Sequence, residues 1–439
     1  VKPVLLTEKV VLSPTPKQEQ WLWQMSMAAT ELYNIALQQR RWHFYRHHGT
    51  TQSLSYTYQN SQLVELKKAF PCFNQLYSLV AQEVLRLVNK DYRSFWGRLK
   101  NQRLNGDEVT ARPPWFKSAL KYFTLPYIQS GFELDGEYLV VSGGMESYKT
   151  SKGKTKRRQY KERIKIEGYR NLPDNIHSLT ISYEKGKYYA NLVYEITPAK
   201  LGSERPLKVV AFDPGVKTFL TGATDSGCLI EVHSTVNRST RYFDKEIDLV
   251  KSKLDRCKKG SRRWRRLKKA LSTLYQRRAG QINGTLHATA KLLANSRHDI
   301  ISVGSPNKLG MVSSDPAKGK GNQRINRAVQ NNWPHKKFLG YLGYKTESRG
   351  KYTHKADERY STQTCSNCGN RQKLKPTIRT YKCPKCTMVL GRDDNAAINL
   401  LNNLLTSFYR PKVNYRDYRK KIYSRTLSGQ WYVAYKKVG

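Results

Sequence analysis

Two Cys-x-x-Cys pairs are the residues whose type and spacing most clearly predict chemistry. Cys365 and Cys368 form the first pair, Cys383 and Cys386 form the second, and 14 residues separate the two pairs. Tetrahedral Zn²⁺ takes four thiolates, and each such turn directs two of them inward. Gly369 supplies the backbone freedom that the first turn needs. A redox pair is the alternative, but two intact pairs favour structural zinc, with no coordination position left for catalysis.

The second chemically active group is acidic. Asp213 ends the apolar run of "VVAFDPG", while Asp393 and Asp394 open a helical run in "GRDDNAAINLL" shortly after the second cysteine pair. Alone, an aspartate such as Asp213 more commonly caps its own turn. Two carboxylates from distant segments are, however, the minimum for holding Mg²⁺ in a polynucleotide-cleaving site, where two ions about 3.5–4 Å apart clamp the attacking water and the leaving oxygen. These acids therefore predict catalytic Mg²⁺.

The net charge predicts a polyanionic partner. The chain of 439 residues carries 79 Lys and Arg against 33 Asp and Glu, a net charge of +46, which is far more than solubility needs. Its 29 Tyr and 8 Trp suit base stacking as well as phosphate contact when they are interleaved with basic residues. Nucleic acid is the expected partner, and a ribosome-type or merely cationic protein is the alternative.

Two segments concentrate this charge. Residues 251–280 hold 13 Lys and Arg and a single acid within a helical stretch predicted for about 242–295. Opposite charges are missing where i,i+4 pairing would place them, which disfavours an ordinary solvated face. Residues 148–163 read as a basic loop, with a solvated hairpin tip as the alternative. We predict nucleic-acid contacts from Arg262, Arg263, Arg265 and Arg266 and from Lys156, Arg157 and Arg158.

The elements that must position these residues alternate along the chain. A strand in 1–15, helices in 16–105 and strands in 106–205 suggest a β-barrel interrupted by a helical domain. Strand–turn–strand, helix, strand, helix, strand and an acid-bearing helix follow in 206–361 and 387–408, the order of an RNase H-like fold. The ribbon occupies 362–386. The segment 409–439 is a basic, aromatic tail, read as either a nucleic-acid-binding extension or a disordered end. The fold class is α/β and multidomain.

Membrane and secretory signals are not expected. No stretch reaches the roughly 18 consecutive apolar residues of a membrane span, and the first thirty residues lack a signal peptide's apolar core. Besides the two cysteine pairs, three thiols lie alone, at Cys72, Cys228 and Cys257. This cysteine usage predicts an intracellular protein, in the cytoplasm or nucleoid of a prokaryote, or in the nucleus if the origin is eukaryotic or viral.

Several motifs together resemble one family. They are "LSPTPKQ", "ARPPWFKSALKYFTLP", "AFDPGVKTFLTG", "RYSTQTCSNCG" and "GRDDNAAINL". They are similar to motifs of the TnpB/OrfB family of transposon-encoded RNA-guided nucleases and their Fanzor relatives, ancestors of the type V CRISPR effectors. The resemblance covers nearly the whole chain. It implies a wedge β-barrel with an inserted helical recognition lobe, a RuvC nuclease domain interrupted by a zinc ribbon, and a guide RNA and target double-stranded DNA as partners.

The resemblance also implies the site residues, with one departure. Asp213 matches the family's first acid and Asp393 its last, so that Asp394 becomes a neighbour. Where most members carry a glutamate on the middle strand, "IISVGSPNKLGM" has Gly304. The chain resembles the Fanzor-like branch, in which a glutamate like Glu358 of "ADERYSTQTC" replaces the missing acid.

The substitution is physically plausible. Neighbouring strands lie only about 4.8 Å apart, so a glutamate on one can reach the place of a glutamate on the other. Alternation places Ala356, Glu358 and Tyr360 on one face of the predicted strand. A surface glutamate without a role, or Glu347 as the replacement, are the weaker alternatives.

The function expected from these features is RNA-guided cleavage of DNA beside a short recognised motif, by Mg²⁺-dependent phosphodiester hydrolysis at Asp213, Glu358 and Asp393. The alternative is a nuclease-deficient RNA-guided DNA-binding protein that acts as a roadblock or regulator. A DNA-joining transposase is disfavoured, because no nucleophilic Tyr or Ser accompanies a metal-binding pair of histidines.

Overall fold

The computed structural model describes residues 3–46, 54–149, 155–168, 172–173, 175–199, 205–216, 218–306, 333–374, 378–413, 418–426 and 428–438. The chain divides into two compact units. One spans Leu5–Ile196, and the other combines Val1–Val4 with Thr197–Gly439. None of the described helices is both long and apolar enough to cross a membrane.

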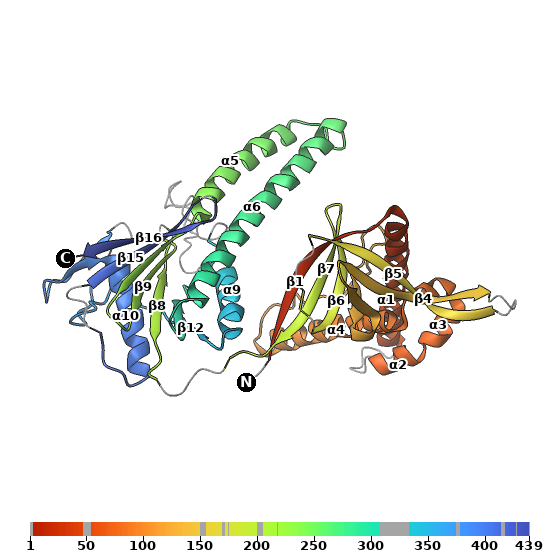
Figure 1. Ribbon diagram of the computed structural model, residues 1–439, viewed down its shortest axis with the longest axis horizontal. Coiled ribbons are helices and arrows are strands. Elements are labelled where there is room, and N and C mark those ends of the chain that lie inside the picture. Colours follow the sequence, from red (N-terminus) through yellow and green to blue (C-terminus); the bar gives the residue numbers. More distant parts are fainter. Residues whose placement is uncertain are drawn as a thin grey trace. The chain divides into compact units, whose positions relative to one another are not determined.

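The first unit contains a seven-stranded sheet (Figure 1). Its strands run in the order β2-β6-β7-β1-β5-β4-β3, and antiparallel pairing joins β2 to β6, β6 to β7, β1 to β5, β5 to β4 and β4 to β3. The strands are β1 (Val4–Ser13), β2 (Leu125–Ile128), β3 (Phe132–Asp135), β4 (Tyr138–Lys149), β5 (Thr155–Glu167), β6 (Ile176–Glu184) and β7 (Lys187–Ile196). The strand-rich segments expected on both sides of the helices are present, whereas closure into a barrel stays a prediction.

Helices separate β1 from β2 along the chain. They are α1 (Pro16–Arg46), α2 (Tyr56–Ser61), α3 (Leu63–Ala69), the 3-10 helix η1 (Pro71–Gln75) and α4 (Ser78–Leu104), and a short turn, η2 (Gln129–Gly131), follows β2. The long helices α1 and α4 pack on each other through buried side chains such as Leu32 and Val84. Their apolar residues also join the core beneath the sheet, so helices and strands share one core.

The prediction of a loop over 148–163 is wrong, because most of these residues form the two strands of a hairpin, which is closer to the hairpin alternative. Residues up to Lys149 belong to β4 and residues from Thr155 belong to β5, which pair as a long hairpin, and 150–154 lie outside the described residues. Contacts between the two strands stabilise the hairpin: Arg158 forms an ion pair with Glu146 and lies over the ring of Tyr148.

The second unit contains another seven-stranded sheet, ordered β12-β11-β8-β9-β10-β15-β16. The antiparallel strands β8, β9 and β10 are followed by β11 and β12, which run parallel to β8. Among the described residues, four helices lie between and after the strands. The chain order agrees with the one predicted for 206–408, except that β10 was not predicted and one helical stretch is two helices. The bounds are β8 (Val209–Pro214), β9 (Leu220–Thr224), β10 (Leu229–His233), β11 (Ile300–Gly304), β12 (Tyr352–Ala356), α5 (Val236–Asp255), α6 (Arg262–Ala294), α9 (His335–Glu347) and α10 (Arg392–Ser407).

Helices cover both faces of this sheet. Alternation along β8 sends Val210 and Phe212 into a core that includes residues of α6 and α9. Val209 and Ala211 point the other way, into a core built with α10. The side chains on one face of β8 therefore pack against α6 and α9, and those on the other face pack against α10. The candidate site lies on the α10 face.

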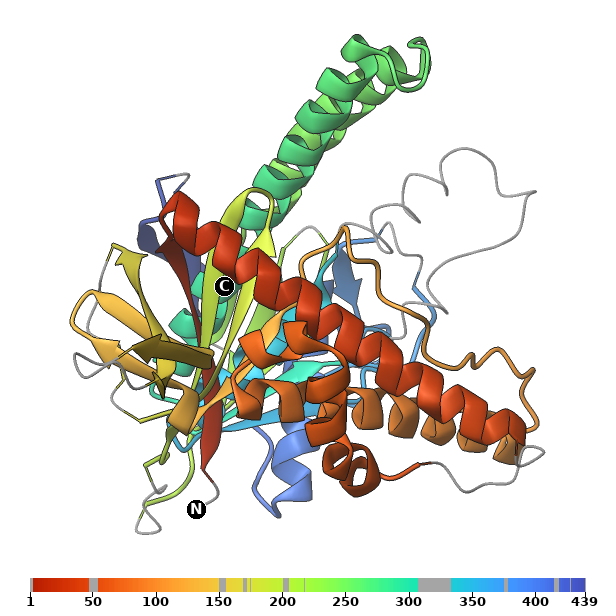
Figure 2. The ribbon, with the colours of Figure 1, turned by 90° about the vertical axis from the view of Figure 1, so that its right-hand side faces the viewer.

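The long helix expected at 242–295 is two helices. α5 and α6 lie side by side as a hairpin that extends beyond the sheet (Figures 1 and 2). The turn between them contains Gly260 at a φ of +86°, a backbone conformation that few other residues adopt, and Ser261 then caps α6 by accepting a hydrogen bond from Trp264 N.

The segment predicted as a separate tail, 409–439, joins the same sheet. Within it β15 (Tyr418–Arg425) pairs in parallel with β10, and β16 (Trp431–Val438) pairs antiparallel with β15. The alternative of a disordered end is therefore wrong for the described residues, whereas nucleic-acid binding by this segment stays a prediction. An unpaired β10 edge offers backbone groups that a further strand can satisfy, which explains the recruitment.

Candidate active site

The three predicted catalytic acids lie on the α10 side of the second sheet. Val209 and Ala211 face α10, so alternation along β8 puts Asp213 on that face as well. Asp393 is the second residue of α10 itself. Glu358 comes two residues after Ala356, which ends β12 and also packs on the α10 side.

The carboxyl group of Glu358 lies beside Gly304, the position at which the family resemblance would place an acid. Val303 of β11 pairs with Phe212, the neighbour of Asp213, and Gly304 pairs with Ala356, so these positions share one edge of the sheet. A Cβ atom on Gly304 would overlap the carboxyl group of Glu358, with Cγ and Cδ at only 2.7 Å. The glutamate therefore fills the space that a side chain at 304 would take.

The strand that was expected to carry Glu358 ends early. β12 is the direct neighbour of β11, as predicted, but it stops at Ala356. Glu358 begins a turn instead, in which its carbonyl oxygen accepts a hydrogen bond from Ser361 N at 3.1 Å. The alternative candidate Glu347 is exposed at the end of α9, five residues before β12 begins and thus toward the other edge of the sheet.

The acids are electrostatically unsatisfied. Burial, with a further contribution from the charge of Asp357, raises the pKa of Glu358 to about 7. Burial and then the charges of Glu358 and Asp393 raise the pKa of Asp213 well above its usual range. Glu358 Oε1 is buried and has no hydrogen-bond partner among the described residues. Partly buried carboxyl groups with raised pKa values, one of which has a buried oxygen without a partner, are candidates for binding a cation.

Asp393 differs from the other two acids because cations already face it. Arg392 approaches its Oδ1 to 3.0 Å and Arg379 its Oδ2 to 3.7 Å. It also lies in the first turn of α10, where the helix dipole favours negative charge. These contacts hold the carboxylate at the entrance of the helix.

Within the described ranges, only the four cysteines bring three or more potential metal-ligand atoms within 4.8 Å of one another. The ligand atoms of Asp213, Glu358 and Asp393 do not all lie that close together.

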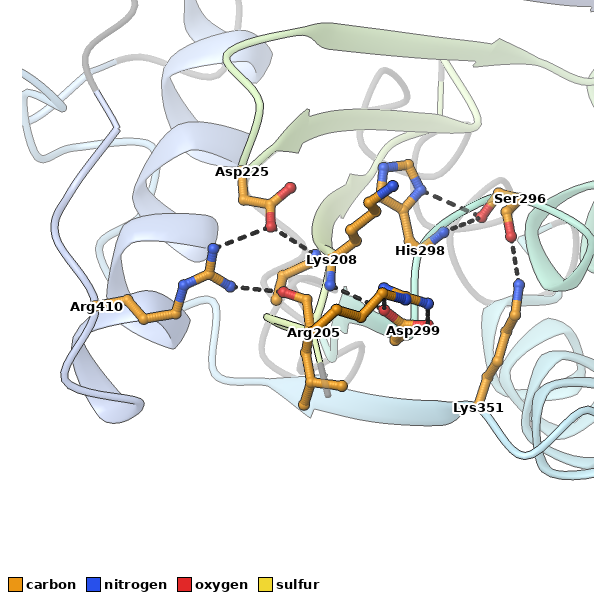
Figure 3. A network of polar contacts seen from close by, with 10 residues as sticks. Arg205, Lys208, Asp225, Ser296, His298, Asp299, Lys351 and Arg410 are labelled. Atoms are coloured by element: carbon orange, nitrogen blue, oxygen red, sulfur yellow. Dashed lines mark hydrogen bonds and ion pairs between the residues drawn. The ribbon is translucent and has the colours of Figure 1, made fainter. Parts of the chain in front are cut away.

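Asp299 and Asp225 lie at the other end of the strands of this sheet and provide a contrast to the candidate catalytic acids (Figure 3). Asp299, directly before β11, receives both guanidinium nitrogens of Arg205 at 2.8 and 2.9 Å and the backbone N–H of Lys208 at 2.9 Å. Burial opposes ionisation there, but the hydrogen bonds outweigh it and lower the pKa of Asp299. Asp225 likewise accepts from Val209 N and Arg410. Asp299 and Asp225 thus have donors that hold them in the fold, whereas the buried Oε1 of Glu358 in the candidate site has no partner among the described residues.

The four cysteines have the geometry predicted for zinc. Sγ of Cys365 lies 3.6 Å from that of Cys386, and Sγ of Cys368 lies 3.5 Å from that of Cys383. A tetrahedron of sulfurs at the usual zinc–sulfur distance has edges of roughly 3.8 Å. The hydrogen bond of Asn367 with Cys386 and those of the backbone lower the pKa of that thiol to about 6, which favours the thiolate. These residues could hold Zn²⁺ in the ribbon, whose strands are β13 (Thr380–Lys382) and β14 (Val389–Gly391).

Two asparagines of α10, here called the asparagine clamp, connect the ribbon with the acids. Asn395 Oδ1 accepts from Ser366 N at 2.9 Å and its Nδ2 donates to Thr364 O at 2.7 Å. Asn399 Nδ2 donates to the carbonyls of Ser361 at 2.8 Å and of Thr364 at 2.7 Å. The clamp thus fixes the segment between Glu358 and Cys365 on the helix that carries Asp393. Sequence reasoning missed it, although both residues stand in "DDNAAINLL" at the i,i+4 spacing of one helix face.

A buried lysine from the C-terminal hairpin was also missed. Lys420 Nζ lies 2.7 Å from Asp394 Oδ2 and 2.8 Å from Glu231 Oε1. Asp394 is consequently engaged in an ion pair behind the helix terminus, in agreement with its predicted place as a neighbour of the acids. The only available signal was the basic character of 409–439, which does not single out one lysine.

The predicted nucleic-acid-binding residues are exposed. Four arginines, Arg262, Arg263, Arg265 and Arg266, open α6, where cations are unfavourable for the helix dipole. Lys156, Arg157 and Arg158 are exposed on β5, with Arg158 paired to Glu146. The two sets belong to different units. Their contacts with nucleic acid remain predictions.

Two family models match adjoining parts of the chain. Residues 191–312 match the OrfB_IS605 family, described as a probable transposase, and this span contains Asp213 and Gly304. Residues 335–400 match the Cas12f1-like TNB domain, and this span contains Glu358, the four cysteines and Asp393. The candidate site and the ribbon therefore lie in the matched segments.

Individual relatives agree with these models. "TnpB-like protein L79" of Acanthamoeba polyphaga mimivirus is 27% identical over 56% of this chain and 47% of its own length. "Putative RNA-guided DNA endonuclease Rv2885c" of Mycobacterium tuberculosis is 30% identical over 44% of this chain and 40% of its own length. The matched part of the chain spans about half the length of such curated relatives, 47% in the first case.

A solved structure shares the fold. The Cas12f1 chain of a cryo-EM structure of the Cas12f1–sgRNA–target DNA complex superposes with a TM-score of 0.61 at 14% sequence identity, covering 88% of this chain and 83% of that one. The resemblance to the TnpB/OrfB family is thereby confirmed, and the α/β architecture resembles that of the Cas12f1 chain. The assignment to the Fanzor-like branch stays a prediction.

Proposed function

We propose that this relative of TnpB/OrfB proteins is an RNA-guided DNA endonuclease of a mobile element, which hydrolyses phosphodiester bonds at Asp213, Glu358 and Asp393. The observation that carries the proposal is the position of Glu358. Its carboxyl group fills the space beside Gly304, at the same end of the strands as Asp213. One of its oxygens is buried and has no hydrogen-bond partner among the described residues. The name of the mycobacterial relative and the contents of the Cas12f1 complex support guide RNA and target DNA as partners.

The three acids fit Mg²⁺. Carboxylate oxygens are its preferred protein ligands. Burial first, and neighbouring carboxylates second, raise the pKa values of Asp213 and Glu358, and a bound cation would favour their ionised forms. Bound Mg²⁺ would activate water and stabilise the leaving oxygen. The chain's part is to hold three carboxylates from β8, the β12 turn and α10 in a fixed arrangement. Structural Zn²⁺ in the ribbon would keep the segment after Glu358 folded.

The test is cleavage of a plasmid that carries the guide-complementary target, by the purified ribonucleoprotein with and without Mg²⁺. The proposal is supported if linear plasmid forms only when Mg²⁺ is present, and if the Asp213→Ala and Asp393→Ala variants form none. The absence of an acid at Gly304 favours a second candidate, the nuclease-deficient DNA-binding protein. Guided binding of the target without any cleavage would establish that function instead.

A further inference from the structure

An exposed aromatic group in the first unit has no role in the site described above. Trp115 is 70% and Phe116 39% exposed, in the segment between α4 and β2. Arg41 of α1 lies beside them, and these three residues are here called the Trp115 platform. Large aromatic rings exposed together in this way commonly mark a binding surface.

The platform is held in place from two directions. The guanidinium of Arg41 lies over the ring of Trp115 at 4.7 Å and over that of Phe116 at 5.4 Å. On the other side, Asn34 accepts a hydrogen bond from Lys117 N at 2.8 Å and donates one to Lys117 O at 2.9 Å. Trp115 is therefore presented to solvent in a fixed position before any partner arrives.

A cavity adjoins the platform. Its volume is about 410 Å³, within the range of small-ligand sites. Aromatic, basic and hydroxyl side chains line it together, and Lys117 also lies over the rings of Tyr33 and Phe123. Lining residues relevant here are Phe116, Lys117, Ser118, Lys121, Tyr122 and Phe123.

The chemistry of this surface selects its ligand. An apolar protein surface would cover Arg41, Lys117 and Lys121 without offering them partners, which is unfavourable. A nucleotide offers a flat π face for the rings and a phosphate for the lysines. The net charge of +46 gives the same preference for a polyanion. We propose that the Trp115 platform stacks an unpaired nucleobase, whose phosphate Lys117 and Lys121 contact.

This base-binding site lies outside the nuclease site and does not depend on cleavage, so it can be tested without Mg²⁺. The experiment compares the affinity of the full-length protein for a short fluorescent oligonucleotide and for the same strand with abasic residues, which keeps every phosphate. Oligouridine and oligothymidine form separate arms and show whether RNA or DNA is preferred. Thermal unfolding of each variant confirms that it is folded.

In the unmodified protein the strand with bases should bind more tightly, by about fivefold to a hundredfold for one stacked base. Trp115→Ala should remove most of that difference while leaving the salt dependence of binding unchanged, because phosphate contacts persist. Trp115→Phe should keep part of it. Leu120→Ala, which removes a side chain 92% exposed in the same segment, is the matched control and should bind like the unmodified protein.

A strand carrying 5-iodouracil in place of uracil locates the base, since irradiation should cross-link it to the peptide that contains Trp115. The proposal is overturned if Trp115→Ala weakens binding equally with and without bases, or if cross-links map only elsewhere. A protein dimer that Trp115→Ala dissociates would also overturn it. If Glu358→Ala abolishes cleavage but keeps base-dependent binding, the nuclease site has been affected and the Trp115 platform has not.

Discussion

At the scale of single residues, the central feature is a glutamate that lies beside a glycine of the middle strand. Gly304 leaves room at the end of β11, and the Glu358 carboxyl group fills it from the turn after β12. The sheet fixes the backbones only about 4.8 Å apart, so either origin can bring a carboxylate to nearly the same point. The position of the charge is what the chemistry requires, and the strand that supplies it can vary.

Because burial raises the pKa of Glu358 to about 7, stability should depend on pH in the metal-free protein. A raised carboxyl pKa means that the folded state holds the proton more tightly, so its stabilising contribution is present at low pH and is lost as pH rises from about 4 through about 7. Glu358→Gln should remove this loss. We expect equal stability of the two proteins near pH 4 and a more stable variant near pH 8, by up to about 3 kcal/mol.

Denaturant unfolding of both proteins in magnesium-free buffer measures the difference directly. Added Mg²⁺ should narrow it at pH 8, because the ion neutralises the ionised carboxylate. A difference that stays flat from pH 4 to pH 8 would mean that Glu358 is not buried as described.

Residue types and spacing predicted the cysteine cluster, because four soft ligands at that interval have few other uses. Asp213 alone was more simply explained as a turn residue, and it gained weight only when paired with the acids of "GRDDNAAINLL". The proposed role of Glu358 needed the family resemblance as well. The asparagine clamp and Lys420 could not be predicted, because their partners are backbone carbonyls and acids that are distant in sequence.

At the scale of elements, the asparagine clamp should align Glu358 with Asp393. Asn399→Asp keeps the shape of the side chain but removes the donor that meets the carbonyls of Ser361 and Thr364. Repulsion between a carboxylate and two carbonyls should shift the segment after Glu358. We expect cleavage to need a higher Mg²⁺ concentration, by roughly tenfold to a hundredfold, as for other residues that orient metal ligands.

Asn403→Asp, at an exposed asparagine of the same helix, introduces the same charge and should leave the Mg²⁺ dependence unchanged. Zinc content, measured by elemental analysis, should stay the same in both variants. A normal Mg²⁺ requirement in Asn399→Asp would show that the clamp does not align the acids.

The ribbon is predicted to depend on its metal. Cys365→Ser or Cys383→Ser should release Zn²⁺ and unfold 362–386, because a site of this size has little core of its own. Cleavage should be lost as well, since the clamp would lose its partners Thr364 and Ser366. Elemental analysis and cleavage measured together are decisive, with Cys257→Ser as the control thiol. Full activity without zinc would refute the assignment.

At the scale of the whole molecule, charge should govern behaviour. The four arginines that open α6 are exposed and gain nothing from the helix dipole, so we infer that an anionic partner compensates them. Replacing Arg262, Arg263, Arg265 and Arg266 by glutamine should weaken nucleic-acid binding and reduce the slope of log affinity against log salt, by up to about one unit for each phosphate that is no longer neutralised. Titrations at several salt concentrations measure this slope, and an unchanged slope would exclude the arginines from the interface.

The architecture was predicted unevenly. Hydrophobic alternation and helical periodicity located most strands and helices, because those patterns are local, but β10 was not predicted. The tail was misread because β15 is a strand only in partnership with β10, nearly two hundred residues earlier. The basic loop failed similarly, since pairing between Arg158 and Glu146 across the hairpin is not visible in either strand alone.

The most direct test of the account is the rate at which the Glu358→Ala ribonucleoprotein cleaves its target, with target binding measured on the same samples and Asp357→Ala as the exposed neighbouring control. We predict a fall in rate of at least about a hundredfold with binding unchanged, because loss of a metal ligand should exceed loss of a residue that merely orients one. Adding Gly304→Glu to this variant should return part of the activity by placing an acid in the vacated space. Cleavage by Glu358→Ala at the unmodified rate would contradict the account.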